Sequence, residues 1–237
     1  MFRAAAQGKP LFFDNAGVAE GNEVFKDRET GSRWQQSSLE AISGPLRGEH
    51  LDIYPFLLTS WGEWRRLHPD TLVLKPLPGY ADRIPAKNAM IRDGLSGEGA
   101  APADVTYHDS RLKPRTMILG LDVAGASKAF PLDALRRVRV VNDLIGGTHV
   151  VVVHQPASDT TTAFVARAAG RTLTFAAAGA DATVLVDRET GSRWDPYGAC
   201  RSGPLKGSTL TPIVLEPEYW FAWSEFHRDT AIYAPAP

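Results

Sequence analysis

The sequence has little cysteine, a formal net charge of only −1 and no long apolar run. Its one cysteine, Cys200, excludes an intrachain disulfide and a cysteine-rich zinc site. Lys and Arg number 26 against 27 Asp and Glu, and this balance argues against binding to nucleic acid or to an anionic membrane. We find no signal-peptide core and no apolar stretch of the roughly 18 residues that a transmembrane helix needs. The compartment stays undecided.

The motifs of the commonest enzyme classes are also missing. The sequence contains no phosphate-binding loop, no Gly-x-Ser-x-Gly elbow, no His-Glu-x-x-His pair and no dinucleotide-binding fingerprint. Sites built from dispersed residues would escape such a search, and no cofactor is indicated. The 21 glycines and 17 prolines recur at short intervals, which favours short strands joined by turns over long helices.

What the sequence does contain is an internal repeat. The octapeptide Asp-Arg-Glu-Thr-Gly-Ser-Arg-Trp occupies residues 27–34 and recurs unchanged at residues 187–194. Two further patterns follow each octapeptide, a Ser-Gly-Pro-Leu segment at residues 43–46 and 202–205 and a pair of tryptophans at residues 61–64 and 220–223. Matched motifs at matched spacing predict two tandem copies of one small unit.

The repeat divides the chain into three expected parts. These are a first repeat at residues 1–75, a connecting arm at residues 76–127 and a second, complete repeat at residues 128–237. The second repeat carries four consecutive valines at residues 150–153, which are typical of a buried central strand. The matching segment of the first repeat would precede Met1, so we expect that repeat to lack its N-terminal portion. The fold class that follows is β-rich α+β, with two similar units related by a pseudo-twofold and joined by an extended arm.

Local patterns predict the structure inside each repeat. The octapeptide reads as a hairpin turn whose tryptophan, Trp34 or Trp194, is buried in the core. Ser60 and Glu63 form a capping box that opens a short helix. The tryptophans of this helix recur at a spacing of three, which favours packing into a core, with a stacking platform for a ring-shaped ligand as the alternative.

These motifs resemble a known family. The octapeptide, the Ser-Gly-Pro-Leu segment, the paired tryptophans and a Pro-Asp-Thr at residues 69–71 are similar to the bacterial family catalogued as domain of unknown function 3179. Ala-Phe-Pro-Leu at residues 129–132 and Val-Asn-Asp at residues 141–143 resemble the start of that family. The resemblance covers nearly the whole chain and implies a fold neighbourhood without a reaction. Family members commonly carry a Tyr-Cys-Pro-Leu-Cys segment, whereas the matching residues 153–157 here read Val-His-Gln-Pro-Ala.

Two sets of residues are candidates for chemistry. His154 ends the strand of valines, and together with Cys200 it could ligate a metal or act as base to a thiol nucleophile. The alternative is a satisfied buried histidine and a small buried thiol. Asp187, Glu189 and Arg193 of the second octapeptide could orient a polar substrate, or could serve only the folding of the hairpin.

Two functions remain open at this point. The first is a non-enzymatic binding or assembly module that engages another protein chain, or a second copy of itself, through an incomplete sheet edge and the connecting arm. In that case we expect the edge near residues 11–13 to be closed by the arm at residues 75–114, by a second copy of the chain or by another protein, because soluble proteins cover or pair such edges. A partner chain is favoured, since the arm is too irregular to replace a strand of valines. The second is an enzyme or a metal- or cofactor-binding redox protein, with its site in or beside the second repeat.

Overall fold

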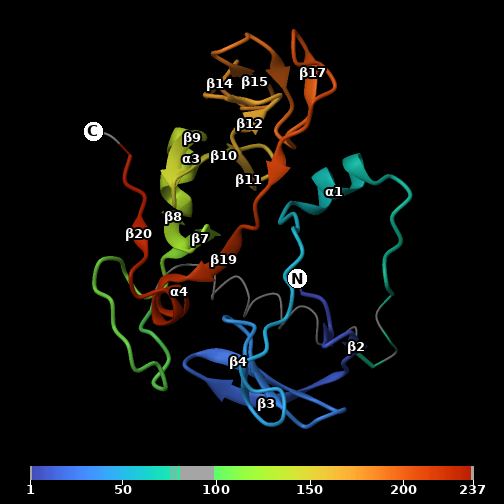
Figure 1. Cartoon of the computed structure of the whole chain (residues 1–237), viewed down its shortest axis with the longest axis vertical. Coiled ribbons are helices and arrows are strands. Elements are labelled where there is room, and N and C mark those ends of the chain that lie inside the picture. Colours follow the sequence, from blue (N-terminus) through green and yellow to red (C-terminus); the bar gives the residue numbers. More distant parts are fainter. Residues whose placement is uncertain (1, 76, 78, 81–98, 236–237) are drawn as a thin grey trace.

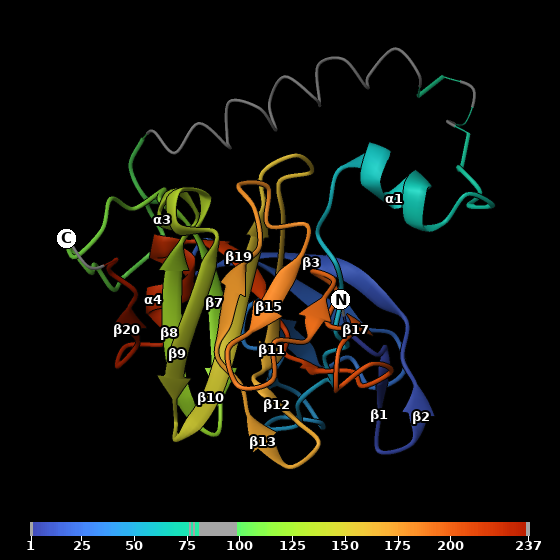
Figure 2. The ribbon, with the colours of Figure 1, turned by 90° about the horizontal axis from the view of Figure 1, so that it is seen from above.

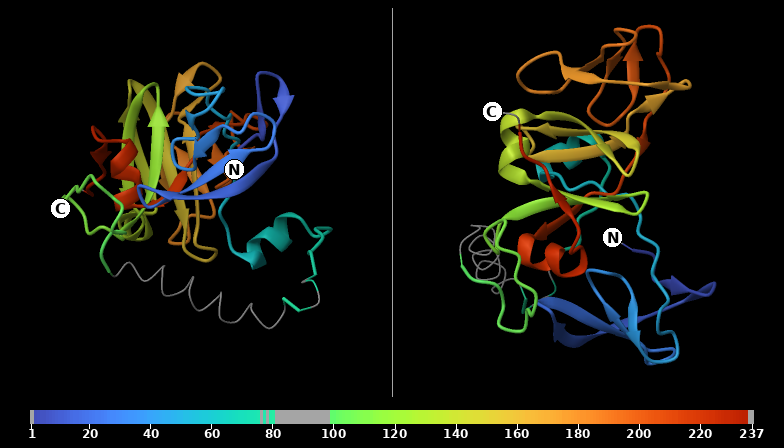
Figure 3. Two further views of the ribbon diagram at one scale, coloured as in Figure 1. Left: turned by 90° about the horizontal axis from the view of Figure 1, so that it is seen from below. Right: turned by 60° about the vertical axis from the view of Figure 1, so that its left-hand side comes forward.

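The protein is β-rich, with short helices, in a computed structural model that describes residues 2–75, 77, 79–80 and 99–235. Its sheets follow one another along the long axis of the molecule (Figure 1). The sheet nearest the N-terminus lies at one end, a similar small sheet of residues 175–202 lies at the other, and two larger sheets lie between them. Figures 2 and 3 show helix α1 (Trp61–Leu67) at the side of these sheets. Glu63 of this helix accepts a hydrogen bond from the hydroxyl of Tyr197.

The sheet at the N-terminal end has four antiparallel strands in sequence order. They are β3 (Phe13–Ala19), β4 (Asn22–Asp27), β5 (Arg33–Gln35) and β6 (Ala41–Ser43). A two-stranded ribbon, β1 (Ala5–Ala6) with β2 (Lys9–Pro10), precedes them. Trp34, which is fully buried, packs with Leu11, Leu46 and Leu51 in the core of this sheet.

The sheet at the opposite end repeats this order. Its strands are β14 (Phe175–Ala177), β15 (Leu185–Asp187), β16 (Arg193–Trp194) and β17 (Cys200–Ser202), after a ribbon of β12 (Arg167–Ala168) and β13 (Arg171–Thr172). Trp194 is 1% exposed and lies in the core. The prediction that both octapeptides form the same strand, turn and strand around a buried tryptophan is therefore confirmed.

The two central sheets pack face to face. One has the order β18-β11-β10-β9 and the other β19-β7-β8-β20, and a shared apolar cluster that includes Leu121, Phe130 and Val152 fills the space between them. The strands are β7 (Met117–Val123), β8 (Ala126–Pro131), β9 (Val140–Ile145), β10 (Thr148–Gln155), β11 (Thr160–Val165), β18 (Thr211–Pro212), β19 (Glu216–Tyr219) and β20 (Ala231–Ile232). The predicted strand of valines is β10, which lies between β9 and β11 with all four valines buried.

Two helices accompany the central sheets. Helix α3 (Leu132–Val138) follows β8 directly and buries Leu135 between the sheets. Helix α4 (Trp220–Phe226) follows β19 and packs on the outer face of β7 and β8 through Trp220 and Trp223. Among the described residues, none of the helices is long and apolar enough to cross a membrane.

The expected connecting arm needs a correction. Residues 117–123, which we assigned to that arm, form strand β7 in the middle of a sheet, paired with both β8 and β19. Gly120 and Asp122 interrupt the apolar pattern, so the strand is not apparent from periodicity. Residues 81–98 of the expected arm lie outside the described residues. Nearer its end, Asp104 accepts a hydrogen bond from the backbone of Gly21, so this part of the arm contacts the β3–β4 turn and not the edge near residues 11–13.

The octapeptides fold alike because each is organised by one buried carboxylate. Asp27 accepts hydrogen bonds from the backbone N–H of Thr30 (2.6 Å), the hydroxyl of Thr30 (2.8 Å) and the indole Nε1 of Trp34 (2.9 Å). Asp187 makes the same three bonds, to Thr190 and Trp194, at 2.6, 2.8 and 2.8 Å. Burial raises the pKa of Asp27, but the hydrogen bonds from Trp34 and Thr30 outweigh it and leave that pKa below its usual value.

The glycine of the Ser-Gly-Pro-Leu segment is required because the backbone passes close to the serine of the octapeptide there. Gly44 and Gly203 have positive φ angles of 93° and 96°, and a Cβ at either would lie 2.6 Å from the Cα of Ser32 or Ser192. Only glycine fits there. The hydroxyl of Ser32 accepts a hydrogen bond from the backbone N–H of Leu46 at 3.0 Å, and the hydroxyl of Ser192 accepts one from Leu205 at the same distance.

Candidate functional site

His154 and Cys200, the first candidate pair, belong to different cores. Side chains alternate along β10, so His154 shares a face with Val150 and Val152, which pack between the central sheets. Cys200 instead packs with Val151 and Val153 on the other face of the same sheet. The sheet thus separates the imidazole from the thiol. Burial also raises the pKa of Cys200, which disfavours the thiolate that metal binding or nucleophilic attack requires.

His154 takes part in a hydrogen-bonded network of its own. Its Nδ1 lies 2.9 Å from the hydroxyl of Thr161, and its Nε2 lies 3.6 Å from Asp159 Oδ1. Burial lowers the pKa of His154, and Arg136 and Arg139 lower it further against the opposing effect of Asp159. The imidazole is therefore neutral near pH 7. No group of three or more His, Cys, Asp or Glu side chains in the described part of the chain could hold a metal ion.

The octapeptide candidates are occupied by bonds within the fold. Asp187 is fully buried under Thr190 and Trp194. Glu189 accepts a hydrogen bond from the backbone N–H of Thr174 at 2.8 Å, which ties the turn to the residue just before β14. Arg193 is exposed on β16. The structure therefore gives Asp187 and Glu189 positions in which their oxygens already hold the hairpin together.

Helix α4 is covered by a sheet. Trp220 and Trp223 are both 0% exposed and pack against Ile118 and Ala129 of β7 and β8. Gly120 permits this contact, since a Cβ at that position would lie 2.2 Å from the ring of Trp223. After the helix, β20 pairs with β8. The indole of Trp223 donates to Thr230 at 3.0 Å, and His227 stacks on it at 3.6 Å between ring centroids.

Helix α1 has the same internal contacts without the cover. Trp64 donates to Thr71 at 3.0 Å, and the ring of His68 lies against that of Trp64 with the centroids 4.1 Å apart and the planes tilted by 36°. Ser60 accepts the backbone N–H of Glu63 at 3.2 Å, which is one half of the predicted capping box. The other half is not formed, because the Ser60 N–H donates to Ser158 and the Glu63 carboxylate pairs with Arg66. Trp61, however, is 53% exposed, and no residue of α1 is buried. The prediction that this helix packs into a core is wrong, because no sheet within the described residues covers it as β7 and β8 cover α4.

The exposed surface continues past α1. Leu72 and Val73 are 96% and 66% exposed, and Leu74 beside them is 94% exposed. They follow α1 at the spacing at which Ala231 and Ile232 of β20 follow α4. We call Trp61, Trp64 and residues 72–74 the α1 surface. Trp64 is half-buried, whereas the other four side chains of this surface are exposed. Large exposed apolar side chains that gather on a surface can mark interaction sites.

The edges of the two small sheets differ in a related way. Phe175 lies at the edge of its sheet, and the side-chain amide of Asn142 on β9 bonds to both its C=O and its N–H at 2.8 Å. Phe13 has the same position, opposite Asp27 as Phe175 is opposite Asp187. Within the described residues, no amide or strand stands against the outer N–H and C=O of Phe13. This edge of β3 is therefore unpaired.

Two carboxylates lie where the first sheet meets the central sheets. Glu218 of β19 accepts a hydrogen bond from the Ser37 hydroxyl at 3.0 Å. Burial, followed by the charge of Glu216, raises the pKa of Glu218 to about 7. Burial also raises the pKa of Glu216, with a further contribution from Asp122. The contact between these parts of the chain therefore includes an acid that titrates near neutral pH.

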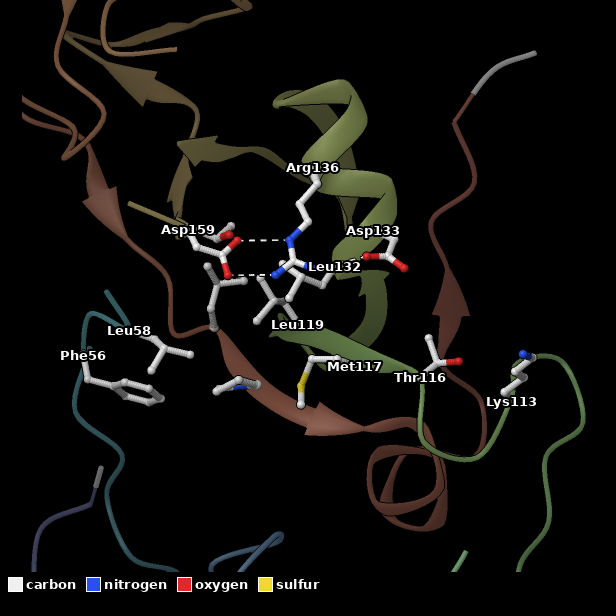
Figure 4. A pocket seen from close by; sticks show the side chains of 13 residues that line it. Phe56, Leu58, Lys113, Thr116, Met117, Leu119, Leu132, Asp133, Arg136 and Asp159 are labelled. Atoms are coloured by element: carbon white, nitrogen blue, oxygen red, sulfur yellow. Dashed lines mark hydrogen bonds and ion pairs between the residues drawn. The ribbon is translucent and has the colours of Figure 1, made fainter. Parts of the chain in front are cut away.

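A cavity of about 620 Å³ lies close to His154. Figure 4 shows Met117 and Leu119 of β7 on one side of it and Phe56 and Leu58, from the segment before α1, on another. Arg136 of α3 forms an ion pair with Asp159 at 2.7 Å on the polar wall. None of these lining residues was selected from the sequence, because they come from distant segments and form no motif.

The sequence analysis also did not select Asn142, although it lies inside the Val-Asn-Asp pattern. Asparagine is uncommon within strands, and this was the one signal that could have drawn attention to it.

Comparisons with known proteins place the chain in a family. Neither a curated protein nor a solved structure matches it. A family model described as "Protein of unknown function (DUF3179)" matches residues 1–230. Because this match spans nearly the whole sequence, the chain belongs to the DUF3179 family.

Proposed function

We propose that the chain is a binding module that completes the fold of its N-terminal part with a segment of another polypeptide. The observation that carries this proposal is the contrast between the two tryptophan helices. Helix α4 is buried under β7 and β8, whereas α1, with the same Trp–Thr and Trp–His contacts, is exposed together with residues 72–74. Exposure of these apolar side chains to water costs free energy, and a partner that covered them would remove that cost.

We further infer that the two parts are copies of one unit, related by a tandem duplication about a pseudo-twofold. Shared bonds support this inference, since both octapeptide turns, both Ser-Gly contacts and both tryptophan helices have matching partners and distances. In this view residues 1–75 and 128–237 are the copies, and β7 extends the second copy toward the N-terminus. The missing cover of α1 then corresponds to the segment β7 to β10 of the second copy.

The contacts of β7 and β9 in residues 128–237 and just before them support a particular chemistry for the proposed partner. A hairpin must cover Trp64, and it must present glycine there, as Gly120 does over Trp223. A neighbouring strand must present a side-chain amide to Phe13, as Asn142 does to Phe175. The two requirements are independent, and together they describe an extended β segment similar to residues 117–153. Addition of strands to an open sheet edge is a common mode of protein recognition.

The experiment supplies this segment artificially. Phe2 pairs with Ile53 as Phe164 pairs with Pro212, so an added copy of residues 115–163 placed directly before Phe2 would enter the fold in register. Hydrogen–deuterium exchange should then show protection of α1 and of residues 72–74. A control fusion with Gly120→Leu and Asn142→Leu in the added copy should give no protection.

The proposal fails if the fusion folds and α1 exchanges as fast as it does in the chain alone. Light scattering on the chain alone provides a second readout. If the chain is a monomer whose α1 surface neither associates nor binds an apolar dye, the surface is stable without a partner, and the case for assembly is lost.

A further inference from the structure

A second cleft, of about 670 Å³, lies between helix α1 and the C-terminal half of the chain. Its walls come from α1, from the turn between β10 and β11, and from the segment that joins β16 to β17. None of its lining residues belongs to the α1 surface, so the cleft and that surface use different parts of the helix. The volume falls within the range of about 300–1,000 Å³ that small-molecule sites occupy.

The ionised side chains that line this cleft cancel in pairs. Arg66 donates to Glu63 at 2.8 and 2.6 Å, and Arg201 donates to Asp195 at 2.7 Å. With two cations and two carboxylates, the lining has no net charge. A charged ligand would lose part of its hydration here without meeting a free group of opposite sign, so the cleft favours an uncharged one.

The two carboxylates are also largely used as hydrogen-bond acceptors. Asp195 accepts two backbone N–H groups on one oxygen, at 3.0 and 2.9 Å, and Arg201 on the other. Glu63 accepts the hydroxyl of Tyr197 in addition to both bonds from Arg66. The bonds from Arg66 and Tyr197 lower the pKa of Glu63 to about 2, so it stays ionised and paired. The spare hydrogen-bonding capacity of the cleft must therefore come from uncharged groups.

Two uncharged groups have that capacity. Gln155 Nε2 and Ser158 Oγ are shielded from water and make no hydrogen bond with any residue that the structure describes. Both residues line the cleft, and they are only 5% and 7% exposed. Tyr197 lies near Gln155, but its hydroxyl donates to Glu63. Folded proteins leave few buried polar atoms without partners, because each such atom costs free energy.

The wall opposite these two atoms is loosely held. No residue of α1 is buried, and the hydrogen bond from the Ser60 N–H to the carbonyl of Ser158 measures 3.3 Å. Segments with few buried contacts move at little cost in free energy. A small shift of α1 would thus open the cleft to a ligand that supplies the missing hydrogen bonds.

We propose that this cleft binds a small uncharged molecule that carries a carboxamide group. The ligand carbonyl accepts a hydrogen bond from Gln155 Nε2, and the ligand N–H donates to Ser158 Oγ, because a hydroxyl can accept as well as donate. The apolar remainder of the ligand lies against Leu67 and Ala157. This site goes beyond the proposed assembly and does not depend on it.

The test compares three probes of nearly one shape, namely 3-phenylpropanamide, 4-phenylbutan-2-one and 3-phenylpropanoate. The ketone keeps the carbonyl of the amide but lacks its N–H, and the carboxylate adds a charge. NMR titration of the full chain should give the amide an affinity at least about threefold above that of the ketone, as expected for one added hydrogen bond, with the carboxylate weakest. Absence of binding by all three, equal affinities for amide and ketone, or a carboxylate that binds most tightly would overturn the proposal.

Variants assign the two hydrogen bonds separately. Gln155→Met should weaken the amide and the ketone alike, whereas Ser158→Ala should remove the preference for the amide over the ketone. Gln36→Met, a substitution of an exposed glutamine after β5, should leave all three affinities unchanged.

Stability provides an independent readout of the same site. Since Ser158 Oγ makes no hydrogen bond, Ser158→Ala should keep the urea midpoint of the wild type. A clear drop in that midpoint would show that the hydroxyl is already bonded within the fold, and would overturn the proposal. Folded variants that bind the amide as the wild type does would show that the amide binds elsewhere, with the same consequence.

Discussion

Glu218 gives the protein a stability that depends on pH near neutrality. Its carboxyl group lies between β19 and the first sheet, where it accepts a hydrogen bond from Ser37, and its pKa is raised from 4.5 to about 7 by burial and by Glu216. A folded-state pKa above the unfolded one means that the folded protein holds the proton more tightly. The resulting stabilisation is complete below pH 4.5 and is lost as the pH rises through 7.

The size of the effect follows from the two pKa values. Each pKa unit corresponds to about 1.36 kcal/mol, so ionisation of Glu218 costs the folded state up to about 3 kcal/mol above pH 7. Glu218→Gln keeps an acceptor for Ser37 and removes the charge. The variant should therefore gain stability relative to the wild type between pH 4.5 and 8, and the gain should level off at higher pH.

Urea unfolding at a series of pH values from 4.5 to 9 measures this difference. Glu189→Gln is a suitable control, because hydrogen bonds to Thr174 outweigh burial and hold the pKa of Glu189 below its usual value. A depressed pKa contributes stability that is present above the unfolded pKa and is lost only in more acidic solution. Between pH 4.5 and 9 this control should therefore be less stable than the wild type by a nearly constant amount. If the difference between wild type and Glu218→Gln does not change with pH, the carboxylate is solvated and the reasoning is refuted.

Three further predictions concern the stability of the fold and can be checked by denaturant unfolding. Trp194→Ala should cost about 3 to 5 kcal/mol, because a buried indole and its hydrogen bond to Asp187 are lost, and a midpoint near that of the wild type would contradict this. Asn142→Leu should cost about 1 to 3 kcal/mol by leaving the N–H and C=O of Phe175 unpaired, and amide exchange at Phe175 should accelerate. Trp61→Ala should cost less than about 1 kcal/mol in the chain alone, and a larger loss would indicate that α1 is covered.

The local structure was largely predictable because it depends on residues close in sequence. The octapeptide contains its own acceptor, donors and glycine, so Asp187, Thr190 and Trp194 can find one another within one turn. The strand formed by the valines of β10 and the helix cap at Ser60 could be predicted for the same reason. β7 was not, since its glycine is explained only by the ring of Trp223, more than a hundred residues away.

The candidate sites were less predictable for a related reason. His154 and Cys200 were selected for their chemistry, but strand parity places them on opposite faces of β10, which becomes clear only once the strand register is known. Arg136 and Asp159 form the polar wall of the cavity although 23 residues separate them. No motif search finds such a pair, because the structural elements that bring the residues together are not local.

Comparison of helices α1 and α4 shows which of their properties depend on local sequence and which depend on neighbouring segments. Both have seven residues, both are followed by a histidine at the C-cap, and in both a tryptophan donates a hydrogen bond of 3.0 Å to a threonine seven residues later. Their burial nevertheless differs completely, since Trp220 is fully buried and Trp61 is 53% exposed. The helix pattern therefore encodes an amphipathic helix, while burial depends on a sheet that another segment must provide. For α4 that segment is β7 and β8, whereas no sheet among the described residues covers α1 in this way, and this contrast is the reason for the proposed partner strand.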